Sequence, residues 1–308
     1  MSQDAWTAAD IPDQQGRTAV ITGANTGLGL ATAQLLAERG AAVVLACRNP
    51  ESAERAAARL AAAAPKSSVQ VLPLDLGSLA SVRRAADRLH ALVDRVDLLI
   101  NNAGVMGTAQ GRTEDGFETQ LGTNHLGHYA WTGLVLDLVL AAPDSRVVQV
   151  SSLAHRQGAI DFDDLHFDRR EYRPMTAYAQ SKLANLLFAL ELQRRLDQAG
   201  AATIALAAHP GIVHTELDKH FARPMRMAMR LVIPVLAQPD TAAGALPTLR
   251  AATDPAARGG TYYSVSSRNE WRGHPVAAEP SPAAQDPALA ARLWQESERL
   301  TRVGYEMR

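Results

Sequence analysis

The feature that most constrains the fold is a regular alternation of short aliphatic runs with longer helix-like segments. The aliphatic runs show no polar alternation and cover residues 18–22, 42–46, 69–72, 96–100, 146–151, 203–207 and 261–265. The helix-like segments cover residues 28–39, 50–63, 78–93, 117–140, 177–198, 241–253 and 287–303. Strands that are apolar on both sides and alternate with helices are typical of a parallel sheet covered by helices on both faces. The sequence therefore predicts an α/β fold with a doubly wound sheet of about seven parallel strands.

Composition excludes several classes of protein. The chain has 308 residues, of which 47% are hydrophobic and 20% charged, so it is long enough for a large globular core. A net charge of −1 gives no general attraction to nucleic acid. The single cysteine, Cys47, allows no disulfide within the chain, which favours a reducing, cytoplasmic location.

The N-terminal and apolar segments do not match targeting or membrane signals. The first ten residues are polar and acidic, unlike a signal peptide. No uncharged apolar run reaches the ~18 residues that a spanning helix needs. The longest candidates are interrupted by Asp137 in one case and by Arg230 and Pro234 in the other. We expect core or substrate-lid helices here, with contact of the second segment with a membrane surface as the alternative.

A glycine-rich loop, T-G-A-N-T-G-L-G, joins the first predicted strand to the first predicted helix. Its glycines, Gly23, Gly27 and Gly29, would let the backbone turn tightly and approach a pyrophosphate, and the helix N-terminus would add N–H groups and a positive dipole. Three residues rather than one separate the first two glycines, so the loop departs from G-x-G-x-x-G. A glycine-rich turn without a ligand is the alternative, but the position between a strand and a helix favours a dinucleotide site.

The end of the second predicted strand bears on the choice of dinucleotide. NAD-binding chains usually place an acidic residue there, which bonds the ribose 2′-hydroxyl. Here the strand ends in A-C-R-N, with Cys47 and Arg48 and no acid. A guanidinium suits a 2′-phosphate in charge and geometry, so the sequence favours NADP(H) over NAD(H). In the alternative interpretation, Arg48 merely lies on the surface and the site accepts either dinucleotide.

A tyrosine and a lysine lie four residues apart in the predicted helix 177–198. Lysine is rare in this chain, which has only Lys66, Lys182 and Lys219. On a helix, the spacing places Tyr178 and Lys182 on one face and within reach of each other. An exposed tyrosine beside an exposed lysine is the plain alternative, and the pair alone does not decide between the two interpretations.

Taken together, these segments resemble the short-chain dehydrogenases/reductases. The resemblance extends from Thr18 to about Val265, and it consists of several motifs in the family's order. These motifs are the glycine loop, Asp75-Leu76, N-N-A-G at 101–104, T-N-H-L-G-H with Asn124, Ser151-Ser152, Y-A-Q-S-K with Tyr178 and Lys182, and H-P-G-I-V-H-T with Pro210, Gly211 and Thr215. Each motif is weak or moderate alone, whereas the ordered set is hard to obtain by chance.

The resemblance implies a Rossmann fold in a single domain over residues 1–308, with a substrate-lobe insertion at about 214–237 and a C-terminal extension at about 266–308. It also implies that a nicotinamide dinucleotide contacts the loops after the strands and the Tyr–Lys pair. The implied contact residues are Gly23, Asn25, Thr26, Gly27, Leu28, Gly29, Arg48, Asp75, Leu76, Asn102, Ala103, Gly104, Tyr178, Lys182, Pro210, Gly211, Val213 and Thr215.

The resemblance further implies catalytic roles for four residues. Tyr178 would act as general acid in carbonyl reduction and as base in the reverse direction. Because a free phenol has a pKa of about 10, the cation of Lys182 would assist by lowering it, and would also bond the nicotinamide ribose. Ser152, rather than Ser151, would hydrogen-bond the substrate carbonyl oxygen, and Asn124 would hold a water that links Lys182 to solvent. In the structural alternative, the serine only ends a strand and the asparagine only satisfies backbone groups.

Other segments resemble one branch of the family, the retinol dehydrogenase and protochlorophyllide reductase-like proteins. The gap between Ser152 and Tyr178 is long and holds an acidic stretch, Asp161 to Asp168, and L-A-C-R, N-H-L-G-H and S-S-L-A-H fit the same branch. This likeness again implies NADP(H), and the lack of an N-terminal anchor leads us to expect a soluble enzyme. The Met-, Leu- and Val-rich segment after Thr215 is the expected wall of an apolar substrate pocket, with ordinary core packing as the alternative.

We therefore predict an NADP(H)-dependent oxidoreductase that transfers hydride between nicotinamide and a carbonyl or alcohol group of an apolar small molecule, such as a retinal-, steroid- or ketone-like compound. An epimerase or dehydratase on the same scaffold and a non-catalytic dinucleotide-sensing protein are the alternatives. No metal is expected, because the spacing of His155, His209 and His214 matches no metal-ligand pattern. By analogy with the family, a homodimer or homotetramer would form through helices 117–140 and 177–198.

Overall fold

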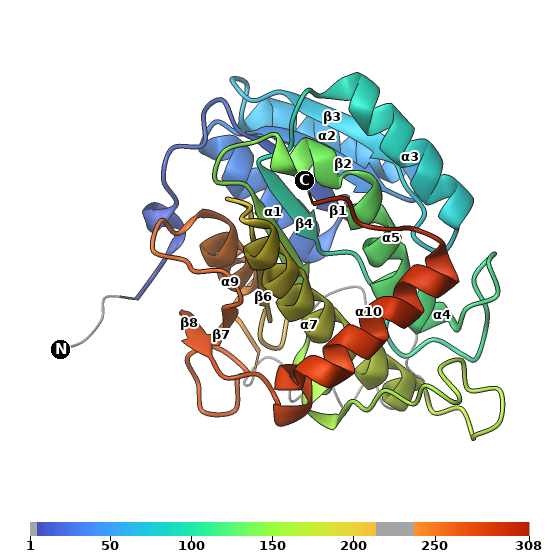
Figure 1. Cartoon of the computed structure of the whole chain (residues 1–308). Helices are drawn as coiled ribbons and strands as arrows, with labels where there is room; N and C mark the ends of the chain where they lie inside the picture. Colours follow the sequence, from blue (N-terminus) through green and yellow to red (C-terminus); the bar gives the residue numbers. More distant parts are fainter. Residues whose placement is uncertain (1–4, 214–236, 308) are drawn as a thin grey trace.

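An eight-stranded sheet forms the centre of the structure (Figure 1). This computed structural model describes residues 5–213 and 237–307. Along the chain the strands are β1 Thr18–Thr22, β2 Ala42–Cys47, β3 Val69–Pro73, β4 Leu98–Asn101, β5 Arg146–Val150, β6 Ile204–Ala208, β7 Tyr262–Val265 and β8 Pro275–Ala278. The strand order is β3-β2-β1-β4-β5-β6-β7-β8, and β1 to β7 pair in parallel, as predicted. Because the chain runs from β1 outward to β3 and then returns to β4, the strand order reverses beside β1.

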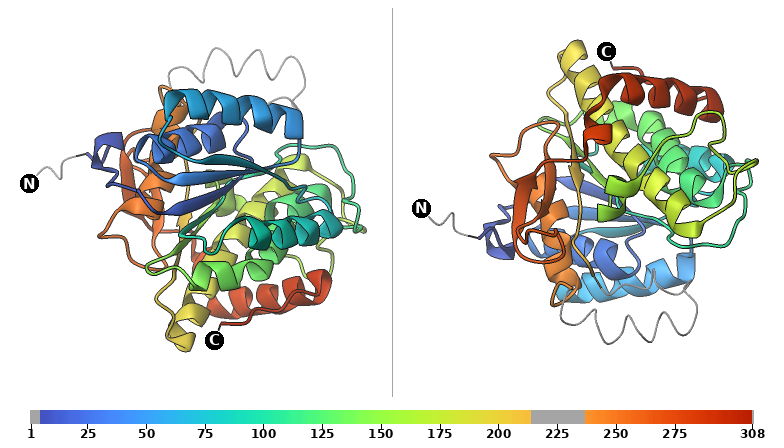
Figure 2. Two further views of the ribbon diagram at one scale, coloured as in Figure 1. Left: turned by 90° about the horizontal axis from the view of Figure 1, so that it is seen from above. Right: turned by 90° about the horizontal axis from the view of Figure 1, so that it is seen from below.

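Helices cover both faces of this sheet (Figure 2). On one face lie α1 Gly27–Glu38, α2 Pro50–Ala63 and α9 Thr241–Thr253. On the other face lie α3 Leu79–Leu92, α5 Gly127–Leu134, α6 Leu136–Leu140, α7 Pro174–Ala199 and α10 Pro287–Thr301. The shorter helical turns are η1 Ala8–Asp10, α4 Thr119–Leu121, η2 Gly122–Leu126, η3 Leu153–Gln157 and η5 Pro282–Gln285. The arrangement is the doubly wound Rossmann fold that the sequence predicts.

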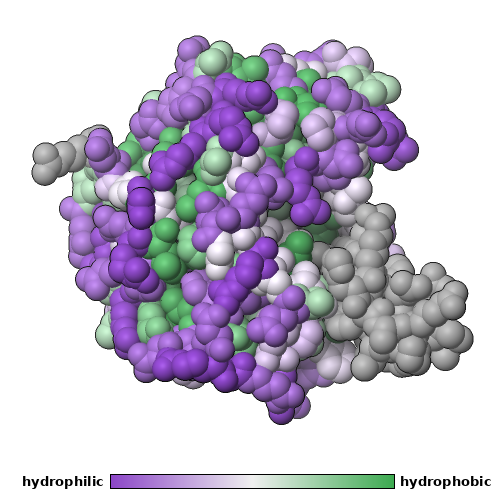
Figure 3. Space-filling view, turned by 90° about the vertical axis from the view of Figure 1, so that its right-hand side faces the viewer, coloured by the Kyte–Doolittle hydropathy of each residue, from purple (hydrophilic) through white to green (hydrophobic). Residues whose placement is uncertain are grey.

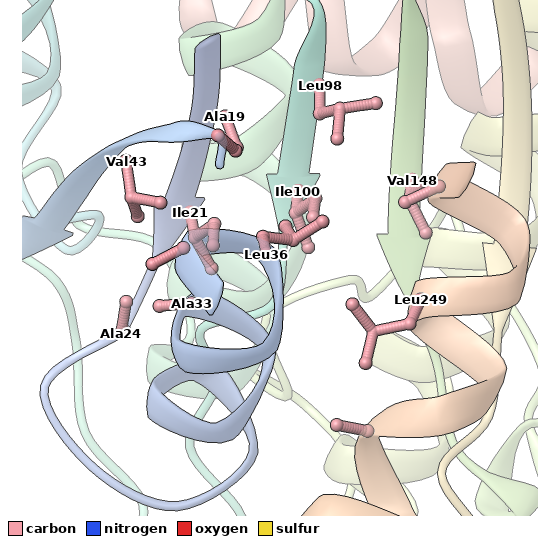
Figure 4. Packing of buried hydrophobic residues seen from close by; sticks show 14 of the residues in the cluster. Ala19, Ile21, Ala24, Ala33, Leu36, Val43, Leu98, Ile100, Val148 and Leu249 are labelled. Carbon is pink, nitrogen blue, oxygen red and sulfur yellow. The ribbon is translucent and has the colours of Figure 1, made fainter. Parts of the chain in front are cut away.

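Alternate residues of the strands enter two separate cores. Ala19 and Ile21 of β1 pack with Leu36 of α1 on one face, where Leu249 of α9 also lies (Figure 4). Val20 of the same strand belongs to the cluster on the opposite face. Because both sets of side chains are buried, a one-residue shift of register would exchange the two faces, so the packing fixes where each strand ends.

Local sequence signals fix where two of the helices begin. Asn49 accepts a hydrogen bond from the Ser52 amide, and Pro50 opens α2 at a position where its missing N–H has no cost. Ser78 caps α3 by accepting from the Ser81 amide. Both caps follow the loops after β2 and β3, so they hold these loops at the carboxyl edge of the sheet.

The segment Phe117 to Leu140 is not the single long helix that the sequence predicts. It contains α4, a π-helical turn at Gly122–Leu126, α5 and α6. At Val135, between the last two helices, the backbone leaves helical geometry, with φ of −119° and ψ of 11°. Tertiary contacts accompany these breaks: a side chain on Gly127 would lie 2.3 Å from the Leu76 carbonyl oxygen. No proline marks the breaks, so the hydrophobic periodicity could not locate them.

Residues 277–287 are rich in proline, alanine and serine, a composition that predicts a loop or linker, and this prediction is wrong at its start. Pro275–Ala278 forms β8, which pairs antiparallel with β7. Proline and alanine have low strand propensity, but here the proline is the first residue of an edge strand, where it is tolerated. The pairing therefore depends on the exposed edge of β7 and not on the local sequence of β8.

The last helix covers the faces of α5 and α7. The rings of Tyr129, Phe188, Trp294 and Tyr305 form a cluster with centroid distances from 4.4 to 6.3 Å, and the Tyr305 hydroxyl donates to the Tyr129 carbonyl. These are the helices through which we expected subunits to pair. Pairing through this face would require α10 to leave it, and the oligomeric state itself stays a prediction.

Within the described residues, no helix combines the length and the apolar character needed to cross a membrane. The face shown in Figure 3 is largely hydrophilic, with hydrophobic residues in small patches between the polar ones. The predicted substrate lobe at about 214–237 lies outside the described residues, apart from Ala237.

Candidate active site

The residues predicted to contact a dinucleotide lie in loops at one edge of the sheet. Because β1 to β6 are parallel, their carboxyl ends meet at the same edge. The loops that leave this edge contain Gly23 to Gly29 after β1, Arg48 after β2, Asp75 and Leu76 after β3, Asn102 to Gly104 after β4, Ser152 after β5, and Pro210 to Val213 after β6. Ligands of open α/β sheets bind where the strand order reverses, which is here between the loops after β1 and β4.

The glycine loop and the N-N-A-G segment fit closely against each other. Gly23 has a φ of 68°, and a side chain on it would lie 3.0 Å from Ala103. A side chain on Gly29 would lie 2.5 Å from Asn102 Nδ2 and 2.5 Å from the Gly23 carbonyl oxygen. Thr26 precedes α1, but its side chain bonds none of the first-turn amides. A cradle that only glycine permits, with uncapped amides at a helix N-terminus, fits a phosphate group.

Replacing Gly29 by alanine is expected to damage this cradle. The new methyl group would lie 2.5 Å from a backbone oxygen, so the loop must shift, and we expect a loss of about 1–3 kcal/mol in the free energy of unfolding together with weaker dinucleotide binding. Thermal unfolding and a fluorescence titration with NADPH measure the two effects. Gly304→Ala is the matched control, because a side chain there meets only Glu298 Oε1, at 3.6 Å. Unfolding and binding equal to those of the wild type would contradict the predicted contact.

A hydrogen-bond network that we did not predict joins these two loops to the π-helical turn. The Thr22 hydroxyl oxygen accepts from the amides of Asn102 and Ala103, each at 2.9 Å, and lies 2.8 Å from His128 Nε2. Because this oxygen already accepts two N–H groups, its own proton is directed to Nε2. His128 Nδ1–H then donates to the Asn124 carbonyl oxygen at 2.9 Å. Burial lowers the pKa of His128 to about 4, so the ring is neutral. The signal that could have indicated this network is that Thr22 and His128 lie in two recognised motifs, T-G-A-N-T-G-L-G and T-N-H-L-G-H.

The loops after β2 and β3 carry Arg48 and Asp75, two of the residues predicted to contact the dinucleotide. Arg48 is exposed directly after β2, and its guanidinium has no ion-pair partner among residues 5–213 and 237–307. Asn25 Nδ2 donates to the Ser52 hydroxyl at 3.1 Å and so ties the glycine loop to the start of α2. Asp75 Oδ1 accepts from the Gly77 amide at 2.9 Å, which holds this carboxylate at the start of its loop.

The segment after β6 meets the glycine loop. Gly211 has a φ of 78°, and a side chain there would lie 2.6 Å from a carbonyl oxygen of the loop between β7 and β8. Val213 and Leu28 lie together against α9, because a side chain on Gly244 would be 2.5 Å from the first and 2.9 Å from the second. Two predicted cofactor segments, far apart in the sequence, thus lie side by side. Thr215 lies outside the described residues.

Tyr178 faces the serine that follows β5. It lies on α7, is only 6% exposed, and its hydroxyl is near enough to the Ser152 side chain for that group to lower its pKa. The Ser152 oxygen also accepts from the Ala154 amide at 3.3 Å. Ser151 has a different position, because its hydroxyl donates to the Lys182 carbonyl oxygen at 2.8 Å. Of the two serines, Ser152 is therefore the one that meets the tyrosine.

The pKa of the tyrosine is shifted in the direction opposite to our expectation. Burial raises the pKa of Tyr178 to about 12, and the nearby Ser152 hydroxyl offsets only part of this effect. Lys182 Nζ lies 5.7 Å from the centre of the Tyr178 ring and donates to the Val150 carbonyl at 3.1 Å. Burial also lowers the pKa of Lys182 to about 8, because the buried site disfavours the charged ammonium form. In the protein alone, burial therefore determines the direction in which the pKa of Tyr178 shifts.

Asn124 lies in the π-helical turn beside Lys182. Its Oδ1 accepts from the Val105 amide at 2.7 Å, and its Nδ2 donates to the Val105 carbonyl and to the Ser181 hydroxyl, each at 2.9 Å. A side chain on Gly104 would lie 3.2 Å from Asn124 Oδ1 and 3.5 Å from Lys182 Nζ. Both N–H groups of the amide are therefore used by the protein, and Oδ1 retains one acceptor position near the lysine.

The two described histidines that were considered as metal ligands bond to protein atoms. His155 Nδ1 lies 2.7 Å from the Ser152 carbonyl oxygen, and His209 Nε2 lies 3.1 Å from the Glu270 carbonyl oxygen. Within residues 5–213 and 237–307, no cluster of three or more His, Cys, Asp or Glu side chains could hold a metal ion. His214 lies outside these residues.

Comparisons with known proteins bear on the family. Residues 17–225 match the family profile described as short chain dehydrogenase. The chain is 42% identical to retinol dehydrogenase 13 of Homo sapiens over 303 residues, which cover 97% of this chain and 87% of that protein. It is also 42% identical to polyprenol dehydrogenase of Mus musculus over 299 residues, which cover 96% of this chain and 86% of that protein.

Solved structures agree with this assignment. An uncharacterized protein from Mycobacterium paratuberculosis superimposes with a TM-score of 0.82 at 44% identity, covering 98% of this chain and 99% of that chain. An active-site complex of Pseudomonas aeruginosa RhlG with NADP has a TM-score of 0.62 at 26% identity, covering 80% of this chain and 94% of that chain. The family binds a nicotinamide dinucleotide. The chain therefore belongs to the short-chain dehydrogenase/reductase family, in its retinol dehydrogenase-like branch, and is an oxidoreductase that acts on CH–OH or C=O groups.

Proposed function

We propose that the protein is an NADP(H)-dependent oxidoreductase of apolar carbonyl or alcohol compounds, with Tyr178 as general acid and base. The observation that carries this proposal is the buried pair of Tyr178 and Lys182, which meets Ser152 at the same sheet edge as the glycine loop. The proposal needs no metal, because the cofactor and a proton donor together suffice for hydride transfer to a carbonyl.

The glycine cradle and the loop after β2 would hold the dinucleotide. Gly23 and Gly27 adopt positive φ values of 68° and 56°, which leaves the backbone amides at the start of α1 open to a pyrophosphate. Arg48 would pair with a 2′-phosphate, since its guanidinium is exposed beside this loop. Asp75 would contact the adenine, as the family resemblance implies. When bound, the dinucleotide supplies the hydride in reduction and takes it up in oxidation.

Tyr178 and Ser152 would act on the substrate oxygen. In reduction, the Tyr178 hydroxyl gives its proton to that oxygen, and the Ser152 hydroxyl donates a second hydrogen bond that stabilises the developing negative charge. The pKa of Tyr178, raised to about 12 by burial, keeps the phenol protonated at neutral pH, which suits the acid role. In oxidation the same phenol must first lose its proton, so the cation of Lys182 matters most in that direction.

Lys182 and Asn124 would return the proton to solvent. Lys182 would bond the nicotinamide ribose and, as a cation, stabilise the tyrosinate. A water that links Lys182 to solvent would be held by an oxygen of Asn124, because the N–H groups of its amide are already used by Val105 and Ser181. Asn124 can therefore bind this water only by accepting a hydrogen bond from it.

The similar proteins bear on the class of substrate. Two of them are named for retinol and for polyprenol, which are both apolar alcohols. We propose an apolar alcohol or aldehyde of this kind for the present chain, in a single domain over residues 1–308 and in the cytoplasm. The pocket wall proposed for the segment after Thr215 lies outside the described residues.

Binding of NADPH and NADH, followed by fluorescence titration, tests the cofactor assignment. The wild type is expected to bind NADPH more tightly, and Arg48→Asp is expected to lose about tenfold or more of this preference, because a hydrogen bond to a charged group contributes roughly 1.5–3 kcal/mol. Arg59→Asp on the exposed side of α2 makes the same change in net charge and serves as control. A wild type that prefers NADH would contradict the role of Arg48.

Turnover of NADPH with retinal, a steroid ketone and a long-chain aldehyde tests the reaction. Oxidation of NADPH with at least one of them supports the proposal, and the best of the three serves as the substrate in the experiments below. If neither dinucleotide binds and none of the three compounds is turned over, the results favour a non-catalytic protein.

A further inference from the structure

The two ring nitrogens of His155 bond backbone groups of two segments that are distant from each other in the sequence. The residue lies in η3, three positions after Ser152, and is completely buried. Its Nδ1 lies 2.7 Å from the Ser152 carbonyl oxygen, and the Ser281 amide lies 3.2 Å from its Nε2. Ser281 follows β8 and precedes η5, in the C-terminal part of the chain.

The backbone partners determine the protonation of this ring. The Ser281 N–H can only donate, so Nε2 is the acceptor and carries no proton. The Ser152 carbonyl can only accept, so Nδ1–H is the donor. Burial lowers the pKa of His155, and the nearby charges oppose each other, with Arg156 lowering the pKa and Glu270 raising it. The ring is therefore neutral and bridges Ser281 to Ser152.

The C-terminal segment also holds η3 by other contacts. The His155 ring packs edge-on against Tyr262, with centroids 5.5 Å apart and an angle of 73°. The Tyr262 hydroxyl donates to Glu270 Oε2 at 3.1 Å, and Arg156 pairs with the same carboxylate. Arg156 also donates to the Glu279 carbonyl at 2.8 Å. The β7–β8 hairpin and Glu279 just after it thus hold both His155 and Arg156 in place.

We infer that His155 is a positioning residue, which fixes Ser152 against the C-terminal segment and so sets the orientation of the Ser152 hydroxyl. The Ser152 carbonyl and hydroxyl belong to one residue in extended backbone geometry, with φ of −155° and ψ of 157°. Holding the carbonyl therefore fixes the origin of the side chain that faces Tyr178. The inference rests on the proposed role of Ser152, and it extends the active site to a backbone amide at position 281. Misplacement of a reacting group by about 1 Å can cost roughly 100-fold in rate.

The amide of Ser281 can be removed without substituting the histidine. Ser281 has a φ of −62°, which proline can adopt, so Ser281→Pro deletes the N–H without a change of φ. The proline Cδ then takes the place of the amide hydrogen against His155 Nε2, so the ring must shift and loses this bond. The serine hydroxyl has no hydrogen-bond partner among the described residues, so Ser281→Ala keeps the amide and serves as the matched control. His155→Phe is a second test, since it keeps a ring against Tyr262 and removes both hydrogen bonds.

The expected result is a fall in kcat of about tenfold or more for Ser281→Pro and His155→Phe with NADPH and the best aldehyde or ketone. NADPH affinity is expected to stay close to the wild type, whereas the melting temperature of Ser281→Pro is expected to fall, because the buried Nε2 of His155 loses its donor. Ser281→Ala is expected to match the wild type throughout. The decisive measurement repeats Ser281→Pro in a Ser152→Ala background. There the substitution is expected to cause no further fall, because it acts through the deleted hydroxyl.

Each other outcome contradicts the inference. Wild-type kcat for Ser281→Pro would show that the amide does not position Ser152. An equal fall in both backgrounds would show a general structural effect that does not act through Ser152. Full activity of Ser152→Ala alone would overturn the proposed role of Ser152 and, with it, this inference, whereas loss of activity in Ser152→Ala with none in Ser281→Pro would overturn the inference only.

Discussion

Tyr178→Phe is expected to lower turnover by about 10²- to 10⁴-fold, while the protein remains folded and still binds NADPH. The substitution removes only the hydroxyl that would exchange a proton with the substrate oxygen. The phenyl ring still fills the buried site on α7, and Lys182 and the glycine loop are unchanged. Ser152 loses the neighbouring phenol but keeps the hydrogen bond of the Ala154 amide, so its position is largely preserved. Steady-state turnover and an NADPH titration on the same preparation separate the two effects.

Tyr263→Phe provides the control for removal of a buried tyrosine hydroxyl. Tyr263 is 4% exposed and lies on β7, where Arg250 stacks on its ring at 5.5 Å from the centroid. Its turnover is expected to equal that of the wild type, because its hydroxyl has no place in the proposed reaction. Turnover of Tyr178→Phe at the wild-type rate would exclude the proposed proton transfer and would reopen the alternative of another reaction on the same scaffold.

Repetitive local signals made most of the fold predictable. The helices Pro50–Ala63 and Thr241–Thr253 begin and end at the predicted residues, and in the first case an asparagine cap and a proline fix the start. Most strands from β1 to β7 were recognisable because they are apolar on both sides, which follows from their burial between two helix layers, whereas β3 at the sheet edge is only partly buried. The doubly wound topology then placed the glycine loop and the N-N-A-G segment at one edge without any knowledge of contacts.

The parts that could not be predicted depend on contacts between distant residues. The π-helical turn at Gly122–Leu126 has no local breaker, and β8 forms only because the edge of β7 is open to pair with it. The same limit applies to the site. Motifs indicated Tyr178 and Ser152, but the Thr22–His128 hydrogen bond spans 106 positions and cannot be read from spacing. The pKa of Tyr178 was expected to fall because the sequence shows the neighbouring charge and not the depth of burial.

Burial of Lys182 leads to the second large effect, which is a conflict between stability and activity. Lys182→Met is expected to abolish most turnover, by about 100-fold or more, because the cation beside the tyrosine is lost. The same substitution is expected to raise the free energy of unfolding by about 1–3 kcal/mol at neutral pH, because it removes a buried ammonium and fills its space with an apolar chain. The Val150 carbonyl does not lose its last donor, since Asn185 Nδ2 also bonds it, at 3.1 Å.

The pH dependence of stability distinguishes this explanation from better packing of the methionine. Burial lowers the pKa of Lys182 from 10.5 to about 8, so between these two values the unfolded chain binds the proton that the folded protein has released. Folding of the wild type is therefore penalised below pH about 8, and this penalty disappears as the pH rises from about 8 to 10.5. The advantage of Lys182→Met should be largest near neutrality and vanish in alkaline solution, as followed by urea unfolding at a series of pH values. Lys66→Met at an exposed position should change neither stability nor turnover. An advantage that is constant with pH would mean that packing, and not the buried charge, sets the stability of the variant.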